Sequence, residues 1–98
     1  MTTLTSTEVT AALAELPGWE GDTSALRREV SAPDFPTAIR IVDEVAVAAE
    51  QSNHHPDIDI RWRKLRFTLS THSEGGVTKL DVELAELISA VARSHEAT

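Results

Sequence analysis

The sequence contains no cysteine, no long hydrophobic run and few basic residues, and each shortage excludes a class of protein. None of the 98 residues is cysteine, so neither disulfide bonds nor thiolate metal sites can stabilise the fold. This absence fits a reducing, cytoplasmic compartment. No apolar stretch approaches the length of a membrane span, and the first ten residues, MTTLTSTEVT, lack the features of a signal peptide.

Acidic residues outnumber basic ones by 16 to 9, which gives a net charge of -7. A field of that sign repels nucleic acid and anionic lipid, so neither is expected as a partner. The one basic cluster is typical of the outward face and turn of a hairpin, with an anionic ligand or a partner protein as open alternatives. It consists of Arg61, Arg63, Lys64 and Arg66.

The length predicts a single domain over residues 1–98. A chain this short buries only about 60–65% of the surface that its unfolded form exposes, so its stability margin is thin. Oligomerisation is a natural way for so small a domain to gain stability.

Capping boxes predict the first and last helices. Thr5 and Glu8 form the first box, and the helix that follows it stops at Pro17. Thr78 caps the last helix with Asp81 as its acidic partner, and leucines then recur at helical spacing.

A longer helix is predicted between Asp34, which acts as its N-cap, and about Ser52. Pro36 fits the first helical turn, where a missing N–H costs little. The expected apolar stripe consists of Phe35, Ile39, Val42, Ala46 and Ala49, with Val45 widening it.

Strands are predicted over residues 26–30 and after Pro56, where apolar residues begin to alternate. A tight turn at Arg63–Lys64 would bring two alternating sets to one face of an antiparallel hairpin. These sets are Ile58, Ile60 and Trp62, then Leu65, Phe67 and Leu69. The order helix, strand, helix, strand, strand, helix predicts an α+β fold, a small antiparallel sheet with helices packed on one face.

Two adjacent histidines, His54 and His55, directly precede Pro56 in the segment EQSNHHP. Proline disfavours a helical conformation at the residue before it, so the histidines occupy a helix-to-strand connection. The predicted hairpin register places His72 opposite residue 55, and three imidazoles then meet at one end of the sheet. Because histidine titrates near pH 6.5, such a cluster suits general acid–base catalysis.

Glu50 and Asp81 are the acids placed to orient an imidazole or raise its pKa. Two other interpretations stay open: the histidines only cap helix carbonyls, or three of them bind Zn²⁺ with a carboxylate. No HExxH-type spacing supports zinc, and we expect no metal. His95, near the C-terminal end, is expected to be a surface residue.

The combination of these motifs resembles the pterin-4a-carbinolamine dehydratase family over roughly residues 16–92. The resemblance is carried by Glu50-x-x-x-His54-His55-Pro56, Trp62, Leu69-Ser70-Thr71-His72, Gly75-Gly76-Val77-Thr78 and Asp81.

The resemblance implies dehydration of 4a-hydroxytetrahydropterin to quinonoid dihydropterin, in the recycling of a tetrahydropterin cofactor. It implies no metal or organic cofactor, a small-molecule pterin substrate, and a homodimer or homotetramer. By position in the motif, His54 and His72 would be the acid–base pair and His55 would bind the pterin. The residues that would support them or bind substrate are Glu50, Pro56, Trp62 and Asp81.

The sequence departs from the family pattern at two positions. Ile58 stands where the family often has an aromatic residue, and Arg63 stands where it usually has asparagine. These departures, with the basic cluster, motivate a rival hypothesis. The chain would then be a non-catalytic dehydratase-like protein that serves as an assembly or interaction partner.

Overall fold

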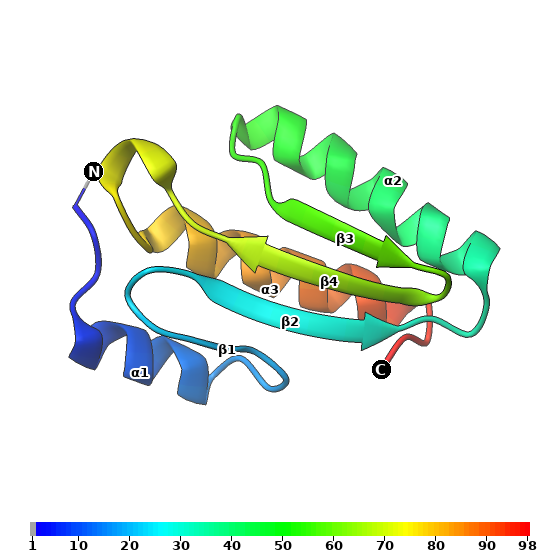
Figure 1. Cartoon of the computed structure of the whole chain (residues 1–98), viewed down its shortest axis with the longest axis horizontal. Coiled ribbons are helices and arrows are strands. Elements are labelled where there is room, and N and C mark those ends of the chain that lie inside the picture. The colour runs from blue at the N-terminus through cyan, green and yellow to red at the C-terminus, as the bar shows by residue number, and fades with distance from the viewer. Residues whose placement is uncertain (1) are drawn as a thin grey trace.

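The computed structural model describes residues 2–98, which form a four-stranded antiparallel sheet and three α-helices (Figure 1). In chain order the elements are α1 (Ser6–Ala14), β1 (Glu20–Gly21), β2 (Leu26–Ser31), α2 (Phe35–Ser52), β3 (Asp57–Arg61), β4 (Lys64–Leu69), the 3₁₀ helix η1 (His72–Glu74) and α3 (Lys79–Ser94). The predicted α+β class is confirmed. None of the helices in this part of the chain is long and apolar enough to cross a membrane.

The strand order is β1-β2-β4-β3, and every neighbouring pair is antiparallel. In Figure 1, α3 crosses behind β2 and β4, and α2 runs along the β3 side of the sheet. The helix α1 lies beside β1, at the other edge. The same face of the sheet is therefore covered by α3 and α2, and its opposite face is open.

The predicted caps are present at all three helices. Capping boxes join Thr5 to Glu8 at α1 and Thr78 to Asp81 at α3. The side chain of Asp34 caps α2 by accepting a hydrogen bond of 2.8 Å from the backbone N–H of Thr37. Local sequence signals thus set where each helix begins.

The β3–β4 turn lies one residue earlier than predicted. Arg61 pairs with Lys64, so Trp62 and Arg63 form the turn, and Trp62 takes a positive φ of 55°. Two hydrogen bonds hold Arg63 in this turn: Ala32 N–H donates to its carbonyl (2.8 Å), and its Nη1 donates to the carbonyl of Ala32 (3.0 Å). A contact distant in sequence therefore determines the register.

This register corrects the predicted alignment of the histidines. Asp57 pairs with Thr68, and two residues further out His55 comes level with Ser70. The prediction that His72 lies opposite residue 55 is therefore wrong by two residues. His72 instead belongs to η1, beyond the end of the ladder.

The apolar stripe predicted for α2 is wrong in part. Phe35 is 51% exposed and Ala46 is also exposed, whereas Ala49 and Val45 are buried as expected. The buried residues of α2 are Thr37, Ala38, Ile41, Val45 and Ala49. Apolar side chains surround much of this helix, so periodicity alone fits more than one face, and packing against the sheet selects between them.

Candidate active site

The end of α2 places His54 by a local backbone motif. Asn53 takes the left-handed conformation (φ 51°), which asparagine tolerates better than most residues, and this ends the helix. The backbone N–H of His54 then donates to the carbonyl of Ala49 at 3.0 Å. Pro56 follows and leads the chain into β3. The ring of His54 is thereby turned back toward the interior.

The buried imidazole of His54 contacts the carboxylate of Asp81. The distance from Nε2 to Oδ1 is 2.6 Å, and the side chains of His54 and Asp81 are 10% and 0% exposed. With Nε2–H donating to the carboxylate, Nδ1 is left as the nitrogen that can take up a proton. Within residues 2–98 Nε of Arg28 is the only fully buried side-chain nitrogen or oxygen without a partner, so Nδ1 of His54 is not such an atom.

Asp81 is held on all sides by hydrogen-bond donors. Its Oδ2 accepts from the hydroxyl of Thr71 (2.7 Å) and from the backbone N–H of Thr78 (2.9 Å). Because the Thr71 hydroxyl donates to Asp81, the neighbouring Thr78 hydroxyl, at 2.7 Å, donates to Thr71. All three residues are buried, so this network fixes the carboxylate that orients His54.

The loop after β4 carries His72 to the same end of the sheet. Thr71 N–H donates to the carbonyl of Gly76 (3.0 Å), which closes the loop, and Gly75 supplies the positive φ of 77° that ends η1. His72 follows Thr71 directly and its side chain is exposed. His72 and His54 are thus linked through Thr71 and Asp81.

His55 differs from its neighbour in both exposure and partner. Its Nε2 lies 2.9 Å from Oε2 of Glu50, and the two side chains are 56% and 80% exposed. A contact this exposed contributes at most about 1 kcal/mol to stability, so it adds little to the fold.

The structure pairs His54 with Asp81 and His55 with Glu50, but it does not bring all of the predicted site residues together. His54, His55 and Pro56 lie at the α2–β3 connection, but Trp62 is 82% exposed in the turn at the far end of the hairpin. The chain by itself does not bring Trp62 to the histidines. Within residues 2–98, no three histidine, aspartate or glutamate side chains gather closely enough to hold a metal ion.

Sequence reasoning missed the two buried threonine hydroxyls. The sequence marks Thr78 only as a helix cap and Thr71 only as part of a motif. The residue type gives little signal, because threonine is common on strands and at caps without any role at a site. Only the fold shows that the Thr71 hydroxyl bonds Asp81 and that the Thr78 hydroxyl bonds Thr71.

The family model described as Pterin 4 alpha carbinolamine dehydratase matches residues 2–91. A relative from Nocardia farcinica is 52% identical over 90 residues, covering 92% of this chain and 95% of its own. A relative from Mycolicibacterium smegmatis is 50% identical over 91 residues, covering 93% and 97%. Both are named for pterin-4-alpha-carbinolamine dehydratase, and their names mark the activity as unproven.

Solved structures are also similar to this chain, including two whose titles mention a pterin dehydratase. One, titled a transcriptional coactivator/pterin dehydratase from Brucella melitensis, has a TM-score of 0.90 and 36% identity, and covers 93% of this chain and 99% of its own. The other is a pterin dehydratase-like protein titled a RuBisCO assembly factor of the alpha-carboxysome. It has a TM-score of 0.63 and 17% identity, and covers 76% and 86%. The second likeness shows a shared fold.

Proposed function

Because the chain belongs to the pterin 4 alpha carbinolamine dehydratase family, we propose that it dehydrates 4a-hydroxytetrahydropterin to quinonoid dihydropterin and water. The observation that carries this proposal is the 2.6 Å contact between His54 and the buried carboxylate of Asp81. A carboxylate in this position selects the Nε2–H tautomer and stabilises the imidazolium that forms when Nδ1 takes a proton.

The reaction needs two proton transfers that histidines can divide. The bond between C4a and the hydroxyl breaks, and a proton delivered to the leaving oxygen makes water. A second proton leaves a ring nitrogen of the pterin, so charge balances without any redox step. We assign these transfers to His54 and His72, each worth about 10²–10⁴-fold if correctly positioned.

His55 and Glu50 are assigned to binding the pterin. Both side chains are more than half exposed, and their 2.9 Å contact fixes the ring of His55 while leaving its face accessible. Pro56 is assigned a supporting role, since it fixes the connection that carries both histidines. We propose tetrahydropterin recycling in the cytoplasm as the setting of this reaction.

The direct test is to follow freshly generated 4a-hydroxytetrahydropterin by ultraviolet absorbance with and without the protein. We expect the protein to accelerate its loss, and we expect His54→Ala and His72→Ala each to lower the rate at least tenfold. His95→Ala is the matched control, because His95 pairs with Glu44 (2.8 Å) at the other end of α3. A folded wild-type protein that gives no acceleration would falsify the proposal.

Exposed apolar side chains support assembly as a homodimer or homotetramer. Val47 is 59% exposed on α2, and Ile60 is 44% exposed on β3, a strand at the edge of the sheet. We expect sedimentation of the wild type to report two or four subunits, and Val47→Glu to shift it toward the monomer. A wild type that sediments as a monomer at micromolar concentration contradicts this part of the proposal.

The rival function, a non-catalytic assembly or interaction partner, is favoured by Trp62. A side chain that is 82% exposed in a turn is a natural contact for another protein. Arg63 is unsuitable for testing this surface, because it holds the turn through Ala32. Under the rival function, Trp62→Ser together with Lys64→Glu abolishes capture of a partner that the His54→Ala protein still captures.

A further inference from the structure

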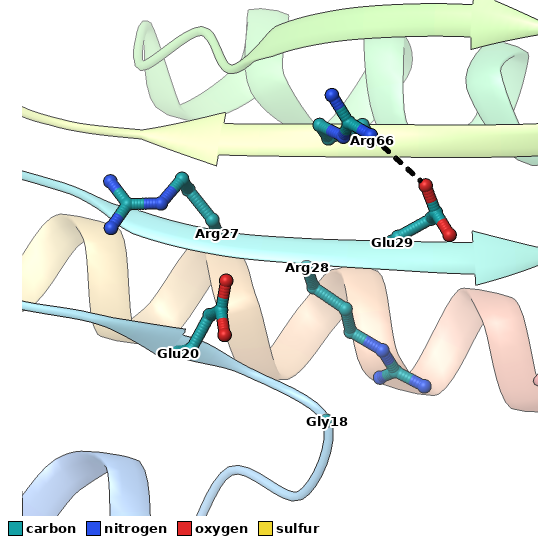
Figure 2. A pocket seen from close by; sticks show the side chains of 6 residues that line it. All are labelled: Gly18, Glu20, Arg27, Arg28, Glu29 and Arg66. Atoms are coloured by element: carbon teal, nitrogen blue, oxygen red, sulfur yellow. Dashed lines mark hydrogen bonds and ion pairs between the residues drawn. The ribbon is translucent and has the colours of Figure 1, made fainter.

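An arginine stands on the buried side of β2. Leu26, Arg28 and Val30 share one face of this strand, and both Leu26 and Val30 are fully buried. Figure 2 shows the side chain of Arg28 directed toward the turn at Gly18, whereas that of its neighbour Arg27 extends the other way. A guanidinium group at this position in a strand needs polar partners.

The partners of Arg28 within the chain are incomplete. Its Nη1 donates to Oγ of Ser89 at 2.9 Å, but its Nε is buried without a hydrogen-bond partner. Gly18 lies directly over this atom, since a Cβ built on Gly18 would come within 3.0 Å of it. The backbone therefore closes over one side of the guanidinium and leaves a buried N–H unsatisfied.

Ser89 is also left with an unused hydrogen. Its Oγ accepts from Arg28 and from Nε1 of Trp19, the latter at 2.9 Å. With both acceptor positions occupied, the hydroxyl hydrogen has no acceptor in the described part of the chain. A ligand that accepts hydrogen bonds would satisfy it.

A second arginine faces the same space. Arg28, Ser89, Arg93 and Thr98 line a cavity of about 360 Å³. Burial, and then the charge of Arg93, lower the pKa of the Arg28 guanidinium. Among residues 2–98, no carboxylate forms an ion pair with either arginine.

Some basic side chains elsewhere on the protein contact an acid. Arg66 pairs with Glu29 at 3.2 Å on the open face of the sheet (Figure 2), and His95 pairs with Glu44 at 2.8 Å. The chain carries 16 acidic residues against 9 basic ones. A cavity that two arginines line, and that no aspartate or glutamate side chain of residues 2–98 lines, is therefore a local exception to the net charge of the whole protein.

We propose that this cavity binds a phosphate group, either free phosphate or the phosphate of a small molecule. A phosphate dianion matches two guanidinium charges, and its oxygens can accept from both arginines and from the Ser89 hydroxyl. The site lies at the C-terminal end of α3, whereas the histidines lie at its N-terminal end (Figure 1). It is thus separate from the proposed dehydration site.

The test is a calorimetric titration of the whole protein with inorganic phosphate at constant ionic strength, repeated with glycerol phosphate and with acetate. We expect phosphate binding to weaken at least tenfold in Arg93→Gln. Arg27→Gln is the matched control, because it removes the same charge from the opposite face of β2 and should bind as the wild type does. Tighter binding of glycerol phosphate than of phosphate would identify a phosphorylated small molecule as the source.

Three results overturn the proposal. These are no saturable phosphate binding by the wild type, equal weakening in Arg93→Gln and Arg27→Gln, or acetate binding as tightly as phosphate. Arg93 lies on the surface of the last turn of α3, so its substitution should leave the fold intact. The dehydration rate of Arg93→Gln should equal that of the wild type, which keeps this test independent of the proposed enzyme activity.

Discussion

The two ends of α3 treat buried ionisable groups in opposite ways. At its N-terminal end, the fully buried Asp81 accepts hydrogen bonds from His54, Thr71 and Thr78, so its charge is matched by donors within the chain. At its C-terminal end, Arg28 and Arg93 share a cavity that no aspartate or glutamate side chain lines, and neither arginine forms an ion pair within the described residues.

The Asp81 end is preorganised by bonds within the chain, whereas the arginine end has donors left over for a ligand. A buried donor left without an acceptor costs about 1–3 kcal/mol, and a small domain has little stability to spare. The network around Asp81 avoids that cost and holds an imidazole in one tautomer, which suits catalysis. The arginine end leaves the cost of the buried Nε–H of Arg28 in place, and the proposed anion would accept from the Ser89 hydroxyl and from the other N–H groups of the two arginines.

Asp81→Ala should have the largest effect, because it removes the acceptor at the centre of the buried hydrogen-bond network. Three donors lose their acceptor, and we expect a loss of about 3–5 kcal/mol in the free energy of unfolding, as for other broken buried pairs. Urea denaturation at neutral pH measures this loss. Glu83→Ala, on the exposed side of the same helix, should change stability by less than about 0.5 kcal/mol. A loss below about 1 kcal/mol for Asp81→Ala would show that the network adds little.

Asp81→Asn should separate orientation from stability. The amide keeps the shape and one acceptor oxygen, but its NH₂ group only donates. His54 and Thr71, which contact different oxygens of the carboxylate, can therefore no longer both find an acceptor there. We expect a smaller loss of stability, about 1–3 kcal/mol. We also expect at least a tenfold lower dehydration rate, measured in the absorbance assay. A wild-type rate in this variant would mean that Asp81 only supports the fold.

Ser89→Ala tests the C-terminal end of α3, where hydrogen-bond donors lack acceptors within the described residues. It removes the acceptor shared by Trp19 and Arg28, and we expect a loss of about 1–2 kcal/mol in the free energy of unfolding. Ser94→Ala is the matched control, since that exposed hydroxyl only donates to the carbonyl of Val91. Phosphate should stabilise the wild type more than Ser89→Ala. An equal rise in melting temperature for both proteins would place the anion elsewhere.

Local signals in the sequence are sufficient to predict the helix starts and to mark two acids as partners of an imidazole. The capping box of Thr78 and Asp81 is read from residues three apart, and it placed Asp81 in a first helical turn near the histidines. The structure then pairs Asp81 with His54, and Glu50 with His55. Both acids are predictable partners for an imidazole, because carboxylates stabilise imidazolium.

Features that depend on contacts distant in sequence could not be predicted. The β3–β4 turn is set by Arg63 and Ala32, which lie 31 residues apart, and no Asn-Gly or Asp-Gly signal marks it. The buried face of α2 was ambiguous because apolar residues surround that helix. Gly18, Arg28 and Arg93 come from three separate segments to line the arginine cavity. The only signal of it in the sequence is the weak alternation of apolar and polar residues in β2.

Glu29→Gln should have the smallest effect. It tests whether an arginine needs to be buried to bind phosphate, or whether it only needs to lack an acidic partner. It frees Arg66 on the open face of the sheet, where the side chains of Arg66 and Glu29 are 60% and 48% exposed. An exposed ion pair contributes about 0.2–1 kcal/mol, so the urea midpoint should barely move. Because water already solvates an exposed guanidinium, the freed Arg66 should add no phosphate binding, and the affinity should stay within about twofold, or about 0.4 kcal/mol. If Glu29→Gln instead restores phosphate binding to Arg93→Gln, the anion binds on the open face beside Arg27 and Arg66, and the contrast between the two ends of α3 fails.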